Sequence, residues 1–323
     1  MDVSIIIVAW NVRKLVYDCL KSVYEQTKDI DFEVIYVDNA SEDGSVEMVK
    51  EQFGDVRIIE NDENKGFIKA NNQGIEISKG RYVLLLNSDT ILLDNAIAQT
   101  VRFADDNPKT ATVGCKVLNP DHTLQRTCFM YPSLLNTFLG ATYLYKIFPK
   151  SKFFGREHMT WCDFNEPMEV QTVCGCYSLV RKEAIDQVGL MDERYFVYGD
   201  DPDWCYRFKN KGWKVMFSPD GRIIHYGGQT TSQKARAFRL QLEGSKLIFM
   251  KLYGSRVAFP FACLLVGLFF LLRVPYWLTF GLLKRKKGEK PLQQALTYLI
   301  GTCYCWTNWR KLLMNREALK GML

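Results

Sequence analysis

Apolar runs alternate with amphipathic stretches along the first third of the chain. The runs lie at Val3–Trp10, Phe32–Val37, Val56–Ile59 and Tyr82–Leu86, and the stretches between them at Val12–Gln26, Ser45–Phe53 and Phe67–Ser78. Continuous apolar runs are typical of buried parallel strands, and an apolar face at helical spacing is typical of the helices that cover them. The pattern therefore predicts an α/β fold with a mostly parallel sheet and right-handed helical crossovers.

Polar residues follow three of these predicted strands. Asp38 opens a turn segment that runs to Gly44, the polar segment 61–66 follows the third strand, and Asp89 comes just after the fourth. Because the carboxyl ends of parallel strands meet at one edge of a sheet, we expect these loops to lie together where such folds bind ligands. Asp89 fits a ligand of Mg²⁺ on a diphosphate, and it equally fits a cap of the next helix.

The pattern is less regular after residue 110. Ala111–Leu118 and Val170–Val180 are predicted as further strands. The stretch Ser133–Phe154 is rich in aromatic and apolar residues without a clear period. We expect this stretch to form either a lid or a loop that faces a membrane.

The most hydrophobic part of the chain lies near its end. Val257–Leu272 is uncharged, Arg273 interrupts it, Val274–Leu283 continues it, and the basic run Lys284–Lys287 follows. Sixteen uncharged residues are slightly short for a membrane-spanning helix. We expect a re-entrant or in-plane hairpin with Arg273 reaching the interface, while a buried helix pair or a dimer interface stays open. Homo-oligomerisation is left open for the same reason.

The charge of the chain is divided unevenly. The net charge is +6 overall, but residues 231–323 carry 16 basic and 3 acidic residues, whereas residues 1–230 carry 26 basic and 33 acidic ones. An acidic body argues against a nucleic-acid-binding protein, and a basic tail suits an anionic membrane surface. The first apolar run has no basic region before it and is read as a strand. The ten cysteines are expected to be reduced core residues.

Carboxylates crowd one short segment of the chain. Asp192, Glu193, Asp200, Asp201 and Asp203 lie within twelve residues, interleaved with aromatic side chains. Carboxylates packed near aromatic rings have raised pKa values and can serve as general bases. Asp203 stands four residues before an arginine at 207, so this pair is expected to be structural.

A histidine at position 225 follows a predicted strand and precedes two glycines. His225 fits a hydrogen-bonded core histidine, and it also fits a functional ligand.

Taken in order, these segments resemble a known family. They are Ser4–Asn11, Val37–Ser45, Asn64–Phe67 with Asn71 and Gly74, Leu86–Asp89, Gly175-Cys176, the block 192–207, and His225. Together they resemble the family 2 glycosyltransferases of GT-A fold, close to the bacterial rhamnosyltransferase-like members. The resemblance covers about residues 3–230, and it implies a Rossmann-like, mostly parallel sheet. It divides the chain into a catalytic domain at 1–230 and a membrane-associating helical region at 231–323.

The resemblance implies roles for particular residues. Asp38 would contact the donor nucleobase, Asp89 and His225 would hold Mg²⁺ or Mn²⁺ on the diphosphate, and Asp201, with Asp200 before it, would be the catalytic base. The remaining implied donor-binding residues are Asn11, Asn39, Lys65, Gly66, Asn71, Ser88 and Gly175. The pair Asp200-Asp201 replaces the usual Glu-Asp, which leaves the division of labour between them open.

The activity implied by this resemblance is inverting glycosyl transfer. It would move a sugar from a nucleotide-diphosphate donor to a lipid-linked saccharide or polysaccharide at the cytoplasmic face of the bacterial inner membrane, in cell-surface glycan synthesis. Gln125-Arg126-Thr127 resembles the rhamnosyltransferase-like members and hints at L-rhamnose. The alternatives are a non-catalytic saccharide-binding scaffold, a nucleotidyltransferase, whose phosphate loop after the first strand is not seen here, and a processive synthase, which would need more spanning helices.

Overall fold

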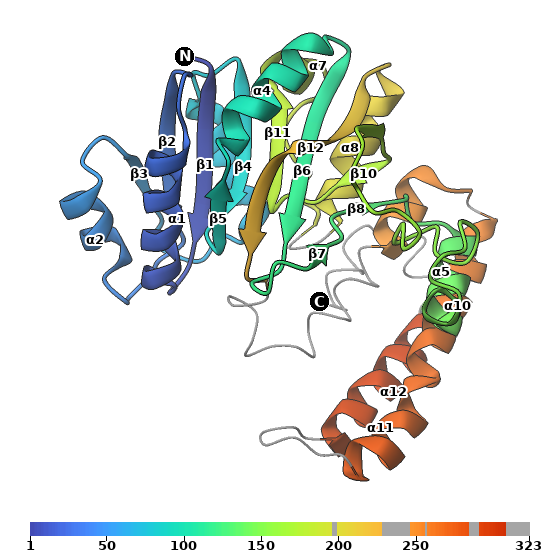
Figure 1. Ribbon diagram of the computed structural model, residues 1–323. Helices are drawn as coiled ribbons and strands as arrows, with labels where there is room; N and C mark the ends of the chain where they lie inside the picture. The colour runs from blue at the N-terminus through green and yellow to red at the C-terminus, as the bar shows by residue number, and fades with distance from the viewer. Residues whose placement is uncertain (196–198, 228–245, 256, 284–290, 308–323) are drawn as a thin grey trace. The chain divides into compact units, whose positions relative to one another are not determined.

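Strands and helices alternate through a large first unit in the computed structural model, which describes residues 1–195, 199–227, 246–255, 257–283 and 291–307 (Figure 1). The chain divides into two compact units. The first contains Met1–Tyr131 and Cys162–Ser232, and the second contains Pro132–Trp161 and Gln233–Leu323. The stretch Ser133–Phe154, which we expect to be a lid or a membrane-facing loop, therefore folds with the C-terminal region. It does not fold with the sheet whose strands precede and follow it in the sequence.

The first unit is built on one mixed sheet in the strand order β3-β2-β1-β4-β11-β6-β12-β5. Its strands are β1 (Val3–Ala9), β2 (Phe32–Asp38), β3 (Arg57–Glu60), β4 (Tyr82–Asn87), β5 (Thr90–Leu93), β6 (Thr110–Leu118), β11 (Tyr177–Arg181) and β12 (Lys214–His225). The short strands β7 (Leu124–Gln125) and β9 (Met168–Glu169) pair antiparallel with β6 and β12, respectively. In a separate two-stranded sheet, β8 (Cys128–Phe129) pairs with β10 (Thr172–Val173).

The predicted parallel half of the sheet is confirmed. Strands β3, β2, β1 and β4 all pair parallel, and the register places Ala9 beside Asp38. Strand β11 then runs antiparallel to both β4 and β6. The α/β prediction is therefore correct, while the expected strand 170–180 is broken by a turn between β10 and β11.

Helices pack their apolar sides against the sheet. In the first unit they are α1 (Arg13–Gln26), α2 (Ser45–Gln52), α3 (Phe67–Ile77), α4 (Ala96–Asp106), α7 (Lys182–Val188) and α8 (Asp200–Asn210). The apolar periodicity of α1 buries Val16, Leu20 and Val23 with strand residues such as Leu84 in one core. Gly74 of α3 allows close packing, because a Cβ there would lie 2.7 Å from Ile6. Such tight cores resist even small changes of side-chain volume.

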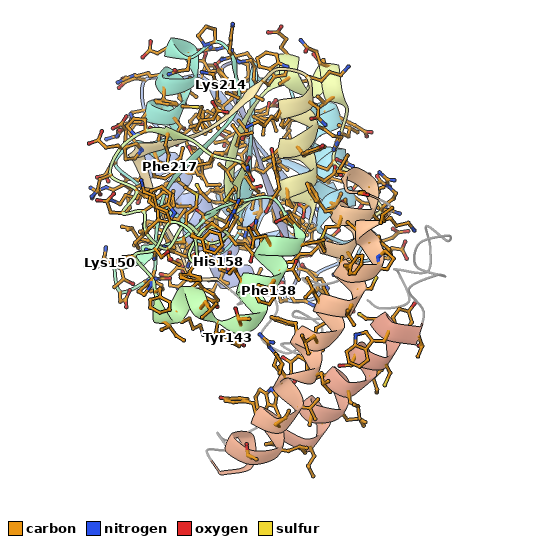
Figure 2. All side chains as sticks on the ribbon, turned by 90° about the vertical axis from the view of Figure 1, so that its right-hand side faces the viewer. Phe138, Tyr143, Lys150, His158, Lys214 and Phe217 are labelled. Atoms are coloured by element: carbon orange, nitrogen blue, oxygen red, sulfur yellow. The ribbon has the colours of Figure 1, made fainter. Side chains whose placement is uncertain are left out.

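The second unit is helical. Its helices are α5 (Leu134–Thr142), α6 (Leu144–Ile147), α10 (Ala258–Leu271), α11 (Arg273–Leu283) and α12 (Pro291–Thr307). Helices α10 and α11 pack against α12, and α10 also packs against α5, where Figure 2 marks Phe138 and Tyr143 nearby. Gly267 permits the close approach of α10 and α12, since a Cβ there would collide with the Trp306 indole.

Arg273 differs from its sequence-based expectation. Its guanidinium is buried inside the second unit, where it donates to the Phe269 carbonyl oxygen and to the Tyr143 hydroxyl. The expectation that it reaches outward failed because partners 4 and 130 residues away satisfy its charge by hydrogen bonds and ring contacts.

One helical segment among the described residues, Ala258–Thr279, is long and apolar enough to cross a membrane, and about half of it is buried within the protein. The sequence pattern also predicts an amphipathic basic helix over residues 232–252, which falls largely outside the described residues. The basic run 284–287 lies outside them as well.

Candidate active site

Asp38 lies at the carboxyl end of β2 and is almost fully buried. Its carboxylate accepts hydrogen bonds from the Tyr36 hydroxyl at 2.8 Å and from the Ser41 N–H at 2.7 Å. Burial and, to a lesser extent, the neighbouring Asp38 carboxylate raise the pKa of the Tyr36 phenol. The phenol therefore keeps its proton and remains the donor in its hydrogen bond to Asp38. Both carboxylate oxygens are thus fixed in place at the sheet edge, which is the orientation that a recognition residue needs.

Asn11 joins the loops that follow β1 and β2. Its N–H donates to the Ser41 hydroxyl at 2.9 Å, and its side-chain oxygen accepts from the Glu42 N–H at 2.8 Å. The residue adopts a positive φ of 53°, a conformation that asparagine tolerates better than most side chains. Asn11 therefore holds the loop that begins at Asp38 against the end of β1.

Asn39 and Gly66 connect this edge to the start of α3. The Asn39 amide donates to the Gly66 carbonyl oxygen at 3.3 Å and accepts from Asn61 at 3.0 Å. Asn71 is buried and bonds the Phe67 carbonyl oxygen one turn back, while Lys65 is partly exposed beside Asp62. Of these, Lys65 supplies a partly exposed cationic group, and the asparagines shape the loops.

The turn Asn87-Ser88-Asp89 separates β4 from β5, and Ser88 and Asp89 are both buried. The pairing of β5 with β12 brings a histidine beside this turn, because Thr90 of β5 pairs with His225 of β12. The His225 Nε2 atom lies 3.2 Å from Asp89 Oδ1 and 3.3 Å from Asn87 Nδ2. A carboxylate and an imidazole, far apart in sequence, thus face each other at the ligand-binding edge.

These two side chains fit a divalent cation that shares its ligands with a substrate. Among the described residues no group of three His, Cys, Asp or Glu side chains lies close enough to enclose a metal. Mg²⁺ commonly uses one or two protein ligands and takes the rest from phosphate oxygens and water. The buried Asp89 and the partly buried His225 match such a partial ligand set, and the described residues do not offer a closed structural site.

Asp200 and Asp201 begin α8, whose N-terminal dipole favours carboxylates. Gly175, in the turn before β11, donates its N–H to Asp201 Oδ1 at 3.0 Å. Burial, and for Asp201 also the neighbouring Asp200 carboxylate, raises the pKa of both groups above the ordinary aspartate range. Asp200 is deeply buried, whereas Asp201 retains some exposure and is the one that can meet a substrate.

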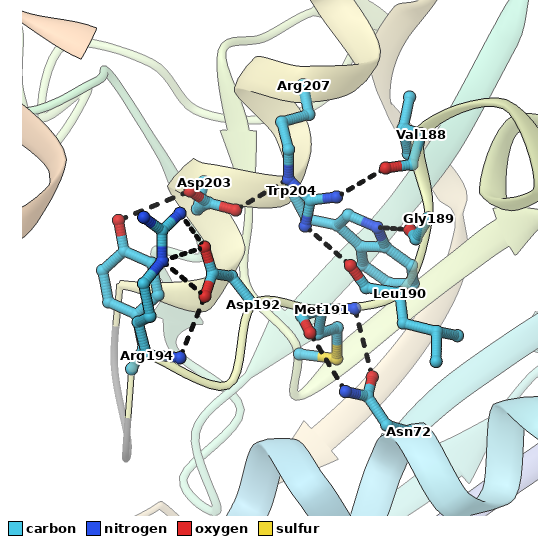
Figure 3. A network of polar contacts seen from close by, with 11 residues as sticks. Asn72, Val188, Gly189, Leu190, Met191, Asp192, Arg194, Asp203, Trp204 and Arg207 are labelled. Carbon is cyan, nitrogen blue, oxygen red and sulfur yellow. Dashed lines mark hydrogen bonds and ion pairs between the residues drawn. The ribbon is translucent and has the colours of Figure 1, made fainter. Parts of the chain in front are cut away.

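The other acids near α8 form a framework (Figure 3). Asp203 pairs with Arg207 Nε at 2.8 Å, and Arg207 also donates to the carbonyl oxygens of Val188 and Leu190 at 2.9 Å each. The expectation of a structural Asp203–Arg207 pair is therefore confirmed. Asp192 pairs with Arg194. Among the described residues, only Asp200 and Asp201 of this cluster lack a basic side chain within ion-pair distance.

Two residues that hold this region together were missed from sequence. Asn72 exchanges two hydrogen bonds with the Met191 backbone, at 3.0 and 3.1 Å, and so ties α3 to the segment before α8 (Figure 3). Gln125 contacts His225 Nδ1 at 2.6 Å. No feature of the local sequence distinguishes Asn72 from its neighbour Asn71. From sequence, the motif that contains Gln125 gives only a hint about the donor sugar.

Backbone contacts link the predicted residues into one site. The Asn87 N–H donates to the Cys176 carbonyl oxygen at 3.1 Å, which brings the Asp89 turn beside Gly175 and hence Asp201. A Cβ on Gly175 would lie 3.9 Å from the Phe67 ring, which follows Gly66. Gly66 in turn bonds Asn39, next to Asp38. The predicted residues therefore share one edge of the first unit.

Carboxylates at the carboxyl ends of parallel strands are typical of α/β folds that bind ligands at this edge, and comparison identifies the family. The family described as Glycosyl transferase family 2 matches residues 4–189, so the chain belongs to this family. The predicted resemblance is confirmed, and the fold is GT-A.

Known relatives sharpen this placement. The chain is 25% identical over 233 residues to the N-acetylglucosaminyl-diphospho-decaprenol L-rhamnosyltransferase of Mycobacterium tuberculosis, covering 67% of this chain and 74% of the relative. It is 23% identical over 309 residues to glycosyltransferase AglE of Haloferax volcanii, covering 94% of this chain and 91% of AglE. These similarities agree with the family assignment and with the resemblance to bacterial rhamnosyltransferases.

Solved structures agree on the fold. The mannosyltransferase PcManGT from Pyrobaculum calidifontis, in complex with GDP-Man and Mn²⁺, aligns with a TM-score of 0.55 at 17% identity, over 99% of this chain and 85% of PcManGT. GalNAc-T7 with UDP, GalNAc and Mn²⁺ aligns with a TM-score of 0.53 at 16% identity, over 78% of this chain and 51% of its own.

Proposed function

We propose that this chain is an inverting, metal-dependent glycosyltransferase that moves L-rhamnose from a nucleotide-diphosphate donor to a lipid-linked saccharide. The observation that carries the proposal is the position of Asp201, which Gly175 holds beside the turn that contains Asp89. A functional analogy is offered by the relative whose name gives an N-acetylglucosaminyl-diphospho-lipid acceptor and rhamnose as the transferred sugar.

The donor would lie along the sheet edge. Asp38, with its carboxylate fixed by Tyr36 and Ser41, would accept hydrogen bonds from the nucleobase. Asn11, Asn39, Gly66 and Asn71 would shape the loops around the nucleoside, and Lys65 and Ser88 would contact its polar groups. Asp89 and His225 would hold a divalent cation, which when bound offsets the charge that builds on the departing nucleoside diphosphate.

Asp201 would act as the general base. Its carboxylate would remove the proton from the acceptor hydroxyl as the hydroxyl oxygen attacks the anomeric carbon and the bond to the diphosphate breaks. A raised pKa strengthens a carboxylate as a base, although it must be ionised to act. One displacement from the face opposite the leaving group inverts the anomeric centre. Asp200, buried behind it, would tune this base.

We place catalysis in residues 1–230 and membrane attachment in 231–323 together with the segment Pro132–Trp161. Exposed apolar side chains of this second unit support the assignment, and they are Phe138, Ile147, Phe148, Phe153, Phe261, Leu264, Leu268, Leu292, Leu296 and Ile300. Exposed apolar side chains gathered in one unit are typical of surfaces that contact another protein or a membrane. A lipid-linked acceptor would bring the substrate to the same cytoplasmic bilayer surface, and cell-surface glycan synthesis would follow.

The test is a donor screen with the full-length protein in detergent or nanodiscs. We expect Mn²⁺-dependent release of dTDP from dTDP-L-rhamnose when an N-acetylglucosaminyl-diphospho-prenol is added, and a product with inverted anomeric configuration by NMR. Turnover with GDP-mannose or UDP-glucose instead would reject rhamnose but keep glycosyl transfer. Binding of a nucleotide sugar without turnover on any acceptor would favour a non-catalytic scaffold.

A further inference from the structure

Strand pairing brings Gln125 and His225 together across 100 residues of sequence. Gln125 of β7 pairs with Val117 of β6, and Val117 pairs in turn with Ile223 of β12, two residues before His225. The Gln125 side chain therefore lies beside the imidazole at the end of β12. Both residues belong to the first unit of the chain.

The orientation of the Gln125 amide is set by two oxygens on one side. Its Nε2 atom donates to Asn119 Oδ1 at 2.8 Å and to the backbone carbonyl oxygen of His225 at 3.2 Å. A backbone carbonyl oxygen can only accept, so the NH₂ group must face it. The amide oxygen, Oε1, is then the atom that lies 2.6 Å from His225 Nδ1.

This geometry determines where the imidazole carries its proton. An amide oxygen has no hydrogen to donate, so Nδ1 must be the donor in the short contact with Gln125. In the neutral ring Nε2 then has a free lone pair, which suits the Asn87 amide group at 3.3 Å. That lone pair also faces the Asp89 carboxylate at 3.2 Å, so two electron-rich groups converge on one point.

We propose that Gln125 is a positioning residue that holds His225 in the Nδ1–H tautomer and so presents Nε2, together with Asp89, to a divalent cation. The inference rests on the proposed function only in supposing that a cation binds there. A hydrogen bond from the far nitrogen of a metal-ligating histidine to an oxygen acceptor is a general device that fixes ring orientation and ligand basicity. Here a neutral amide supplies that oxygen, and the carbonyl of the same histidine orients the amide.

The first test reads the tautomer directly. The chain has only three histidines, so two-bond ¹⁵N–¹H spectra of the ¹⁵N-histidine-labelled full chain contain three ring systems, and His225→Asn identifies the one of interest. In mildly alkaline buffer without metal, we expect His225 as the Nδ1–H tautomer. Finding the Nε2–H tautomer in the unmodified protein would overturn the proposal, and this measurement does not depend on any variant folding.

The second test uses matched variants and Mn²⁺ alone. Gln125→Leu removes the acceptor and should release the tautomer and weaken Mn²⁺ binding, measured by electron paramagnetic resonance, by about 10- to 100-fold. Gln125→Glu keeps an oxygen acceptor and should restore both readouts. Gln187→Leu makes the same change at an exposed position on α7 and should leave the tautomer and Mn²⁺ affinity unchanged.

The outcomes separate this inference from the proposed function. Unchanged Mn²⁺ affinity in a folded Gln125→Leu variant, or an equal loss in Gln187→Leu, would overturn the positioning role and leave glycosyl transfer untouched. Absence of Mn²⁺ binding to the unmodified protein would overturn the metal role of His225 as well. Product formation in the donor screen judges the transferase proposal independently.

Discussion

The Gly175 N–H donates to Asp201 Oδ1 at 3.0 Å, and a Cβ at position 175 would lie 2.9 Å from that same oxygen. A side chain at position 175 would therefore push the Asp201 carboxylate aside. The family resemblance implies that Gly175 binds the donor, whereas its contact in the structure is with the proposed base. Gly175 thus determines where the Asp201 carboxylate sits.

Gly175→Ala should displace the Asp201 carboxylate and lower kcat by about 100-fold, the typical cost of misplacing a reacting group by about 1 Å. Donor affinity should change little. Gly54→Ala is the matched control, since a Cβ there meets no atom within 4 Å. Steady-state kinetics, combined with separate measurements of donor binding, test this prediction. Full activity of Gly175→Ala would contradict the expected displacement of the Asp201 carboxylate.

Asp201→Asn should lower kcat by about 10²- to 10⁴-fold, because it removes the proton acceptor and keeps the shape of the side chain. Donor binding, measured by calorimetry in the presence of Mn²⁺, should be retained. Asp106→Asn, on the exposed end of α4, is the control. An equal loss of donor binding and turnover would mean that Asp201 binds the donor and is not the base.

Asp200→Asn should raise the thermal stability of the protein at pH 7. Burial raises the pKa of Asp200 above its ordinary value of 3.8, so the folded state holds the proton more tightly than the unfolded state does. Its stabilising contribution is full below the unfolded pKa and is lost as the pH rises through the folded pKa.

The gain from Asp200→Asn should therefore be present at pH 7 and fade toward pH 4, which melting curves across this range would measure. A gain that is independent of pH, or a loss at pH 7, would contradict burial of an ionisable carboxyl as its cause. Active-site residues commonly reduce stability in this way.

Arg207→Met should destabilise the first unit by about 3–5 kcal/mol, because it leaves the fully buried Asp203 carboxylate without its partner. The backbone carbonyl oxygens of Val188 and Leu190 also lose their donors. Lys209→Met breaks only an exposed pair with Glu169 and should cost less than about 1 kcal/mol. Urea unfolding compares the two, and equal effects would show that the buried network of Figure 3 adds nothing.

An apolar stripe on α10 should contribute to membrane binding. Phe261, Leu264 and Leu268 follow helical spacing and are exposed. Replacing all three with glutamine should release the protein from anionic vesicles, since each large apolar side chain contributes about 1.5–3 kcal/mol when buried. Vesicle sedimentation measures this. Retention of the triple variant would shift attention to Phe148 and Phe153 in the segment Pro132–Trp161.

The local pattern of hydrophobic and polar residues determined the first half of the sheet and the positions of Asp38 and Asp89 after its strands. The alternation of apolar runs and amphipathic stretches is sufficient to specify β1 to β4, because parallel strands joined by helices leave their carboxyl ends at one edge. Asp38 and Asp89 could therefore be assigned to a ligand edge from their places after apolar runs. The family resemblance then named the remaining candidates.

Tertiary structure alone decided which side chains meet. The antiparallel insertion of β11 between β4 and β6 brings Gly175 to Asp201, and the pairing of β7, β6 and β12 brings Gln125 to His225. The burial of Arg273 against Tyr143 likewise joins residues 130 apart. Contacts at such separations depend on strand order and register, which local hydrophobic periodicity does not encode, and so the sequence by itself predicted the candidates while only the folded chain paired them.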